Sequence, residues 1–185
     1  NFLGTDTVEA LVAVRYLYGE QTAGFSVPAA EHSTITAWGR EHEQAAYSNM
    51  IEKFSNCGAP AYSIVSDSYD LWKAVDMFCG PLKEQVLAGG GRVVPRRDSG
   101  DPVVIVPEIL RGLAAGFGAE KNSKGFYVLH PKVRTIQGDA IDHESGPRVL
   151  QAIKDAGFST ENVVFGSGGG LLQKVNRDTL GYAMK

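Results

Sequence analysis

Short apolar runs alternate with longer amphipathic stretches along the chain, and this alternation predicts the fold. β-Branched and aromatic residues gather in runs that predict buried strands at 61–66, 91–94, 133–136 and 162–165. In the longer stretches apolar residues recur every three or four positions, which predicts helices at 8–17, 41–54, 71–78, 102–117 and 149–156. Strands that alternate with helices indicate an α/β fold with a parallel sheet or barrel.

The polar stretches between these elements predict connections. Residues 31–34 are expected to form a polar turn, and residues 120–125 a polar loop that contains a glycine. A further strand is expected near 180–184. The chain contains no low-complexity segment and no obvious linker, so residues 1–185 are expected to form one domain.

Three predicted strands are each followed by Asp-x-x-Asp. The second aspartates, Asp70, Asp101 and Asp142, stand where a helix N-cap belongs, so they have a structural explanation. The first aspartates lie at the carboxyl ends of strands, where α/β folds bind ligands; they are Asp67, Asp98 and Asp139. Carboxylates there could hold Mg²⁺, for which Asp67 and Asp98 are the expected ligands, or accept hydrogen bonds from sugar hydroxyls.

A glycine-rich turn follows the predicted strand at 162–165. The sequence Gly166-Ser167-Gly168-Gly169-Gly170 would let the backbone approach a phosphate, and the next helix would offer free N–H groups. A glycine-rich turn without a ligand is the alternative. The turn is not a P-loop, because it lacks the Gly-Lys-Ser/Thr ending. Arg96 and Arg97, just before Asp98, are expected to add anion-binding groups on the same face.

Composition narrows the possible partners. The net charge is −3, so the chain offers no global basic field for nucleic acid. No apolar run approaches the roughly 20 residues that span a bilayer, and no signal peptide is visible. The two cysteines have no zinc or redox spacing, so we expect a cytoplasmic protein with reduced thiols. Because residue 1 is Asn, the sequence is expected to be a piece of a longer chain.

Several ordered motifs together resemble the nicotinamide phosphoribosyltransferases, which are type II phosphoribosyltransferases. They span the chain: Gly4-Thr5-Asp6-Thr7, residues 26–39 (SVPAAEHSTITAWG), Val65-Ser66-Asp67-Ser68-Tyr69-Asp70, Asp98-Ser99-Gly100, Asn122-Ser123-Lys124-Gly125, Ile136-Gln137-Gly138-Asp139 and residues 165–174 (FGSGGGLLQK). The resemblance implies an irregular TIM-like α/β barrel, of which this chain is the central part. It also implies a homodimer with shared active sites.

The resemblance further implies a reaction. Phosphoribosyl pyrophosphate and nicotinamide would give nicotinamide mononucleotide and pyrophosphate, with Mg²⁺ as cofactor. ATP would phosphorylate His32 to assist turnover. Carried over by position, Arg96 and Asp98 contact the base and ribose region, and Gly138 and Asp139 the ribose.

The remaining site residues follow from the same resemblance. Asp6 would bind the carboxamide of nicotinamide, with Ser26 and Ser63 lining the tunnel beside the base. Phosphate groups would be held by Gly168, Gly169, Arg177 and Lys185. A carboxylate at Asp6 would favour nicotinamide, because it accepts a hydrogen bond from an amide and repels nicotinate.

Each residue also has a simpler interpretation. Asp6 could be a helix N-cap, and Arg177 and Lys185 could be solvated surface charges. His32 alone would pass for a hydrogen-bonded histidine, and only the surrounding motif points to catalysis. Two positions depart from the family: Arg97 replaces a common proline, which leaves open whether Arg96 or Arg97 takes the family arginine's role, and Ala140 replaces a common glycine.

Two other functions remain open at this point. A nicotinate phosphoribosyltransferase would share most of these motifs, although Asp6 argues against it. A non-catalytic fragment could retain a phosphate site or an interaction surface without turnover. The family's ring-stacking residues have no counterpart in residues 1–185, which favours that alternative for the isolated chain.

Overall fold

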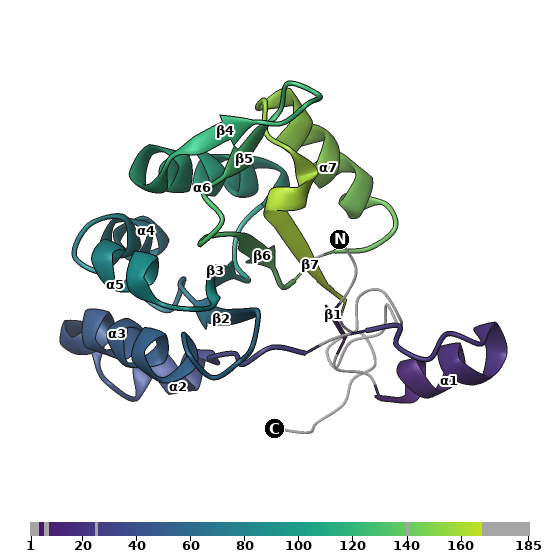
Figure 1. Ribbon diagram of the computed structural model, residues 1–185, viewed down its shortest axis with the longest axis horizontal. Helices are drawn as coiled ribbons and strands as arrows, with labels where there is room; N and C mark the ends of the chain where they lie inside the picture. The colour runs from purple at the N-terminus through teal and green to yellow at the C-terminus, as the bar shows by residue number, and fades with distance from the viewer. Residues whose placement is uncertain (1–3, 6–7, 25, 140, 168–185) are drawn as a thin grey trace, which may run out of the picture.

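The computed structural model describes residues 4–5, 8–24, 26–139 and 141–167. Parallel strands form a central sheet in the order β1-β7-β6-β3-β2 (Figure 1). Its strands are β1 (Gly4–Thr5), β2 (Ala61–Val65), β3 (Arg92–Arg97), β6 (Thr135–Gln137) and β7 (Val163–Ser167). The predicted α/β class and parallel pairing are therefore confirmed, while closure into a barrel stays a prediction.

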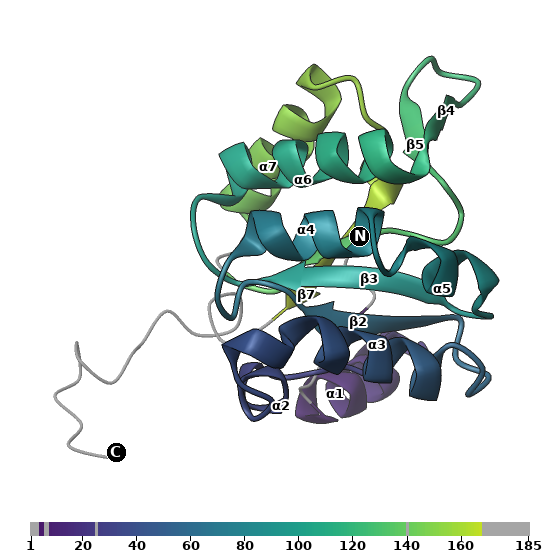
Figure 2. The same cartoon turned by 90° about the vertical axis from the view of Figure 1, so that its left-hand side faces the viewer.

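Helices connect and cover the strands. They are α1 (Val8–Tyr18), α2 (His32–Thr36), α3 (Glu43–Phe54), α4 (Leu71–Cys79), α5 (Lys83–Ala88), α6 (Pro102–Phe117) and α7 (Ser145–Asp155), with short 3₁₀ turns η1 (Arg40–His42) and η2 (Thr160–Asn162). Figure 2 shows β2 and β3 between α3 on one side and α4 and α6 on the other. Among the described residues, no helix has both the length and the apolar character that crossing a membrane would require.

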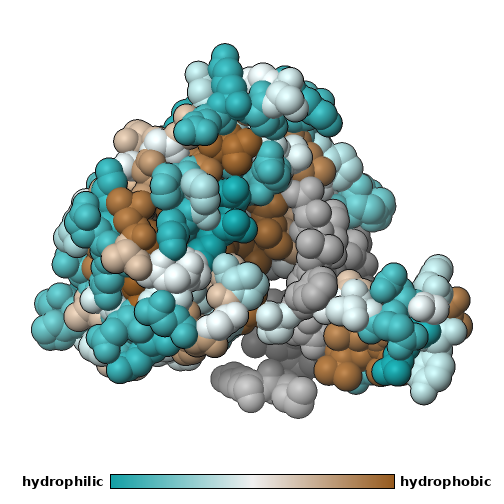
Figure 3. Space-filling model, viewed as in Figure 1, coloured by the Kyte–Doolittle hydropathy of each residue, from teal (hydrophilic) through white to brown (hydrophobic). Residues whose placement is uncertain are grey.

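The core lies between the sheet and these helices. Fully buried strand residues such as Ile64, Val93 and Phe165 pack with the inward side of α6, which supplies Ile109 and Leu113. Burial of this kind contributes roughly 1.5–3 kcal/mol per large apolar side chain. By contrast, α1 exposes Val8, Tyr16 and Leu17, and Figure 3 shows apolar side chains on the surface of this helix.

Two of the three predicted aspartate caps, Asp70 and Asp101, are present. Asp70 Oδ1 accepts hydrogen bonds from the amides of Trp72 (3.0 Å) and Lys73 (3.2 Å) at the start of α4. Asp101 Oδ1 accepts from Val103 N (2.9 Å), with Pro102 in the first turn of α6. The prediction for Asp142 was wrong by two positions: the N-cap of α7 is Glu144, and Asp142 Oδ1 accepts from the amides of Glu144 (2.9 Å) and Ser145 (2.8 Å) in the turn that precedes the helix. Each cap satisfies backbone donors that the helix leaves free.

Three local predictions were wrong or incomplete. Residues 31–34 are not a turn: Glu31 and Thr34 form a capping box that starts α2. The expected loop at 120–125 joins a hairpin of β4 (Ala119–Lys121) and β5 (Tyr127–Leu129), whose strands are too short to reveal an alternating pattern. Helix α5 was missed because it buries only one apolar residue, Val86.

Candidate active site

The carboxyl edge of the sheet gathers charged residues from α2 and from the turns after β2 and β3. Arg96 is the centre of this cluster. Its guanidinium donates to both carboxylate oxygens of Glu31 (3.2 and 3.0 Å) and to Asp98 Oδ2 (3.1 Å). A planar guanidinium suits this two-point contact. Arg96 therefore ties the start of α2 to the end of β3.

These contacts shift both partners toward their charged forms. Burial opposes the charge on Arg96, but the bond to Glu31 and the nearby Asp98 outweigh it and raise the pKa of the guanidinium. The same bond to Arg96 lowers the pKa of Glu31. The pair is therefore ionised across the neutral pH range.

Asp67, which follows β2, accepts hydrogen bonds on both oxygens. Oδ2 accepts from the backbone amides of Asp98 (2.9 Å) and Ser99 (2.8 Å) and from Ser99 Oγ (2.5 Å). Oδ1 lies 3.1 Å from His32 Nε2. Burial acts to raise the pKa of Asp67, but these hydrogen bonds outweigh it and lower the pKa. The result is an ionised carboxylate that holds both the 98–99 turn and the imidazole.

His32 lies in the first turn of α2 with 44% of its side chain exposed, whereas Asp67 exposes 4%. One ring nitrogen is held by the buried carboxylate, and the ring remains accessible from solvent. A carboxylate in this position orients the imidazole ring. The geometry suits a histidine that exchanges a proton or a group with a ligand.

Asp98 lies beside Gly138 of the neighbouring strand end. Oδ2 contacts Arg96, while Oδ1 is buried without a hydrogen-bond partner among the described residues. A Cβ added at Gly138 would overlap Asp98 Oδ1. Glycine at this position therefore creates the space in which the Asp98 carboxylate sits.

Comparison with known proteins places these residues in a family. Residues 1–185 match the nicotinate phosphoribosyltransferase (NAPRTase) family along their whole length. The chain belongs to this family. The resemblance inferred from the motifs is thus confirmed.

The chain is also similar to individual nicotinamide phosphoribosyltransferases. The one from Xanthomonas campestris pv. campestris (strain 8004) is 50% identical over 186 residues, covering 100% of this chain and 39% of that protein. Those from Acinetobacter baylyi and Mycoplasma pneumoniae are each 34% identical over 100% of this chain, which covers 40% and 41% of their lengths. The chain thus spans about two fifths of the length of these relatives.

The structure brings together four of the site residues expected from the sequence. His32, Asp67, Arg96 and Asp98 form one hydrogen-bonded network, with Gly138 against it. Asp139 is exposed beside Gly138. Five further expected residues lie outside the described part of the chain: Asp6, Gly168, Gly169, Arg177 and Lys185.

The two expected tunnel serines differ in their surroundings. Ser63 lies in β2, is 3% exposed, and its hydroxyl has no hydrogen-bond partner among the described residues. Its backbone N–H donates to Pro28 O (2.8 Å), and its carbonyl accepts from Ala30 N (2.9 Å). Segment 28–30 therefore runs beside β2. Ser26 is exposed in the stretch that leads into this pairing.

The prediction that Arg96 and Arg97 share one anion-binding face was wrong. Successive strand residues point to opposite sides, and Arg97 is fully buried on the other side from Arg96. Its Nη2 donates to Gly100 O (2.8 Å), while Nε and Nη1 have no partner among the described residues. Burial lowers the pKa of this guanidinium. Arg96 is thus the arginine available to a ligand.

Two functional contacts were missed from the sequence. Glu31 was expected only as part of a polar turn, although it is the bidentate partner of Arg96. Ser99 was noted only as part of a motif, although its amide and hydroxyl both bind Asp67. The Asp98-Ser99-Gly100 turn after a strand is the signal that could have identified Ser99, because short polar side chains in turns bond nearby groups.

Magnesium can be tested against this donor set. Within the described ranges, no group of three His, Cys, Asp or Glu side chains is arranged to hold a metal ion. Oδ2 of Asp67 already accepts three hydrogen bonds, and Oδ1 is in contact with His32, so Asp67 has little free capacity for an ion. Asp98 Oδ1 has no such donor. Because Mg²⁺ is commonly bound by one or two carboxylates together with substrate phosphates, Asp98 fits this role.

Proposed function

We propose that the protein transfers phosphoribosyl from phosphoribosyl pyrophosphate to nicotinamide, giving nicotinamide mononucleotide and pyrophosphate in NAD salvage. The observation that supports it best is the Arg96–Asp98–Asp67–His32 network in a chain that is 50% identical to a nicotinamide phosphoribosyltransferase. In this proposal the parallel sheet is part of an irregular TIM-like barrel.

The network suits the binding of the base and ribose. Arg96 is held by Glu31 and Asp98 with 15% of its side chain exposed, so its guanidinium plane is fixed before a ligand arrives. We assign the base and ribose region to Arg96 and Asp98, and the ribose hydroxyls to Gly138 and Asp139. Asp6, Ser26 and Ser63 complete the tunnel for the nicotinamide ring. Fixed polar groups of this kind lower the cost of orienting the substrate.

Charge develops as pyrophosphate leaves the ribose. The C1–O bond to pyrophosphate breaks, the sugar acquires oxocarbenium character, and the ring nitrogen of nicotinamide forms the new C1–N bond. Asp98 would hold Mg²⁺, which neutralises charge on the leaving pyrophosphate. Gly168 and Gly169 would bind the 5′-phosphate. Arg177 would reach phosphate groups of the partner subunit's site in a homodimer, which makes the two active sites shared, and Lys185 would bind on the pyrophosphate side.

His32 is the proposed acceptor of a phosphoryl group from ATP. With the proton on the ring nitrogen that faces Asp67, the other ring nitrogen has a free lone pair. That nitrogen would attack the γ-phosphorus, the bond to the β–γ bridging oxygen would break, and ADP would leave. The ionised Asp67 carboxylate would stabilise the positive charge of the ring.

Nicotinate is the alternative substrate, because the matching family is named for it. The test is mononucleotide synthesis by the intact protein from phosphoribosyl pyrophosphate and Mg²⁺, with nicotinamide and nicotinate in separate reactions. Product from nicotinamide in large excess over product from nicotinate is expected. Product from nicotinate alone would refute the assigned substrate, and no product from either base would refute the proposed activity.

The same assay tests the role of His32 and the alternative of a non-catalytic fragment. His32→Ala is expected to abolish stimulation by ATP and to retain basal synthesis, while His42→Ala serves as the matched control. Undiminished stimulation in His32→Ala would exclude the phosphohistidine. Residues 1–185 alone are expected to turn over poorly, and robust synthesis by this chain would show that it is self-sufficient.

A further inference from the structure

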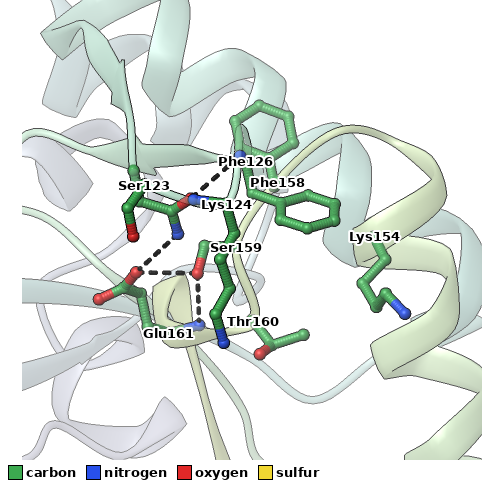
Figure 4. Close-up of a pocket in the computed structure, with 9 residues that line it drawn as sticks. Ser123, Lys124, Phe126, Lys154, Phe158, Ser159, Thr160 and Glu161 are labelled. Atoms are coloured by element: carbon green, nitrogen blue, oxygen red, sulfur yellow. Dashed lines mark hydrogen bonds between the residues drawn. The ribbon is translucent and has the colours of Figure 1, made fainter.

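A cavity of about 550 Å³ lies at the amino edge of the sheet, away from the site described above. It opens between the turn that joins β4 to β5 and the segment that runs from the end of α7 through η2 (Figure 4). The first segment immediately precedes β5 and the second immediately precedes β7, so the cavity lies at the amino end of β7, whereas Gly166 near its carboxyl end lies against Gly138. Its volume falls within the range of small-molecule sites.

The walls of this cavity are fixed by amide side chains. Asn122 Oδ1 accepts from the backbone amides of Lys124 (3.0 Å) and Phe126 (3.1 Å), which closes the turn on one side. Asn162 Oδ1 accepts from Leu129 N (2.8 Å), and its Nδ2 donates to the carbonyls of Tyr127 (2.8 Å) and Ser159 (2.9 Å). These bonds join β5 to the other wall. The cavity is therefore preformed.

The charges around the cavity are unbalanced. Lys124 and Lys154 both line it, and neither takes part in an ion pair within the described ranges. The carboxylate of Glu161 also lines it, but accepts from Ser159 Oγ (2.8 Å) and Asn122 Nδ2 (3.4 Å). Glu161 also interacts electrostatically with Arg134. The cavity therefore has two ammonium groups without an ion pair among the described residues and one carboxylate that already accepts hydrogen bonds. This excess of positive charge favours an anionic ligand.

The apolar part of the lining is aromatic. Phe126 and Phe158 line the cavity, and Figure 4 shows the side chains of Lys124 and Lys154 on either side of Phe158. Aromatic faces bind flat heterocycles, and base–aromatic stacking contributes about 1–3 kcal/mol per base. Lysine ammonium groups bind phosphate as point charges. The lining therefore combines the two chemistries that a phosphorylated aromatic ligand needs.

We propose that this cavity is a second binding site, which takes a nucleoside phosphate with its base against the half-buried ring of Phe126 and its phosphate between Lys124 and Lys154. The site does not depend on the proposed reaction, because it shares no residue with the network at the carboxyl edge. A nucleotide bound here would contact the segments that lead into β5 and β7, and Gly166 near the far end of β7 lies against Gly138.

The test is calorimetric titration of the intact protein with adenosine monophosphate. To remove competing binding at the carboxyl edge, all titrations use an Arg96→Gln background. Dissociation constants below about 1 mM are expected, with adenosine and inorganic phosphate each binding about tenfold more weakly. In Lys124→Gln/Lys154→Gln the affinity for adenosine monophosphate should fall about tenfold or more, because two charged contacts are lost. Lys121→Gln, on the same hairpin outside the cavity, should stay within about twofold.

Three results would overturn the proposal. The first is equal affinity in the double variant and in its parent. The second is equal affinity for adenosine and adenosine monophosphate, which would leave the lysines without a role. The third is no binding at millimolar nucleotide, which is the result if another part of the intact protein fills the cavity.

Discussion

The two edges of the sheet are held together by different chemistry. At the carboxyl edge, ionised groups contact one another: Arg96 binds Glu31 and Asp98, and Asp67 binds His32 and the 98–99 turn. At the amino edge, the neutral amides of Asn122 and Asn162 fix the cavity walls, and Lys124 and Lys154 have no ion pair among the described residues. The first edge should therefore respond to pH, whereas the architecture of the second should not.

The largest loss of stability is expected at the amino edge. Asn162 is fully buried and makes three hydrogen bonds to the backbone of β5 and η2. Asn162→Ala should lower the free energy of unfolding by about 3 kcal/mol, because it leaves the buried Leu129 amide without an acceptor. Urea unfolding measures this loss, which should be the same at pH 5 and pH 8 since no titrating group is removed.

The partly exposed Asn122 provides the matched control for that change. Asn122→Ala removes two backbone contacts in a turn that water can reach, so it should cost only about 1 kcal/mol. Equal losses in the two variants, or a loss at Asn162 that depends strongly on pH, would contradict the distinction between the edges.

The next largest effect should be on activity at the carboxyl edge. In Gly138→Ala the new methyl group collides with Asp98 Oδ1 and must displace the carboxylate. We expect kcat/KM for the proposed reaction of the intact protein to fall about 100-fold, since small displacements of positioning groups have effects of this size.

Gly58→Ala is the control that distinguishes displacement of the Asp98 carboxylate from a general loss of stability. Gly58 has a positive φ (86°), and a Cβ there would meet no atom within 4 Å. This variant should lose stability through backbone strain and keep its activity. If Gly138→Ala retained full activity, Asp98 would not need the position that the structure gives it.

The dependence of the unfolding free energy on acid pH should distinguish the carboxyl edge of the sheet from the amino edge. The pKa of Asp67 is lowered in the folded protein, so its stabilising contribution is fully present above its unfolded value of about 3.9 and is lost as the pH falls through the folded pKa. Asp67→Asn should lower the unfolding free energy by about 2 kcal/mol at neutral pH, because charge-assisted bonds to the 98–99 turn are lost.

Unfolding of both proteins between pH 2 and pH 7 measures this dependence. The difference between Asp67→Asn and the parent should shrink below about pH 4, where the parent loses the same charge. Asp76→Asn, on the outer part of α4, is the control and should show little difference at any pH. A constant difference for Asp67→Asn down to pH 2 would mean that its ionisation does not stabilise the fold.

Patterns within single segments of the sequence were enough to predict much of the fold. The strands near 64, 93, 135 and 164 and the helix at 102–117 follow from local periodicity, and the aspartate caps follow from the ends of those elements. The meeting of Asp67 and Asp98 follows from the common edge of parallel strands.

Contacts between distant segments were not predictable in the same way. Glu31 contacts Arg96 because segment 28–30 pairs with β2. No local pattern in the sequence predicts this pairing or its register. The hairpin of β4 and β5 has strands of only three residues. It is held in place by Asn162, which accepts a hydrogen bond from Leu129, 33 residues earlier in the chain. Such contacts depend on tertiary packing rather than on local propensity.

The smallest change in stability is expected at Arg97, the exception within the charged edge. Its side chain is fully buried and makes one hydrogen bond among the described residues, to Gly100 O, so much of its desolvation is uncompensated. Arg97→Met should therefore alter the unfolding free energy by no more than about 1 kcal/mol, because buried charges are often replaced by apolar groups at little cost. Arg96→Met is the matched comparison and should cost more, since Glu31 and Asp98 lose their partner. A loss at Arg97 as large as that at Arg96 would show that its attraction to Asp67, Asp98 and Asp101 outweighs desolvation.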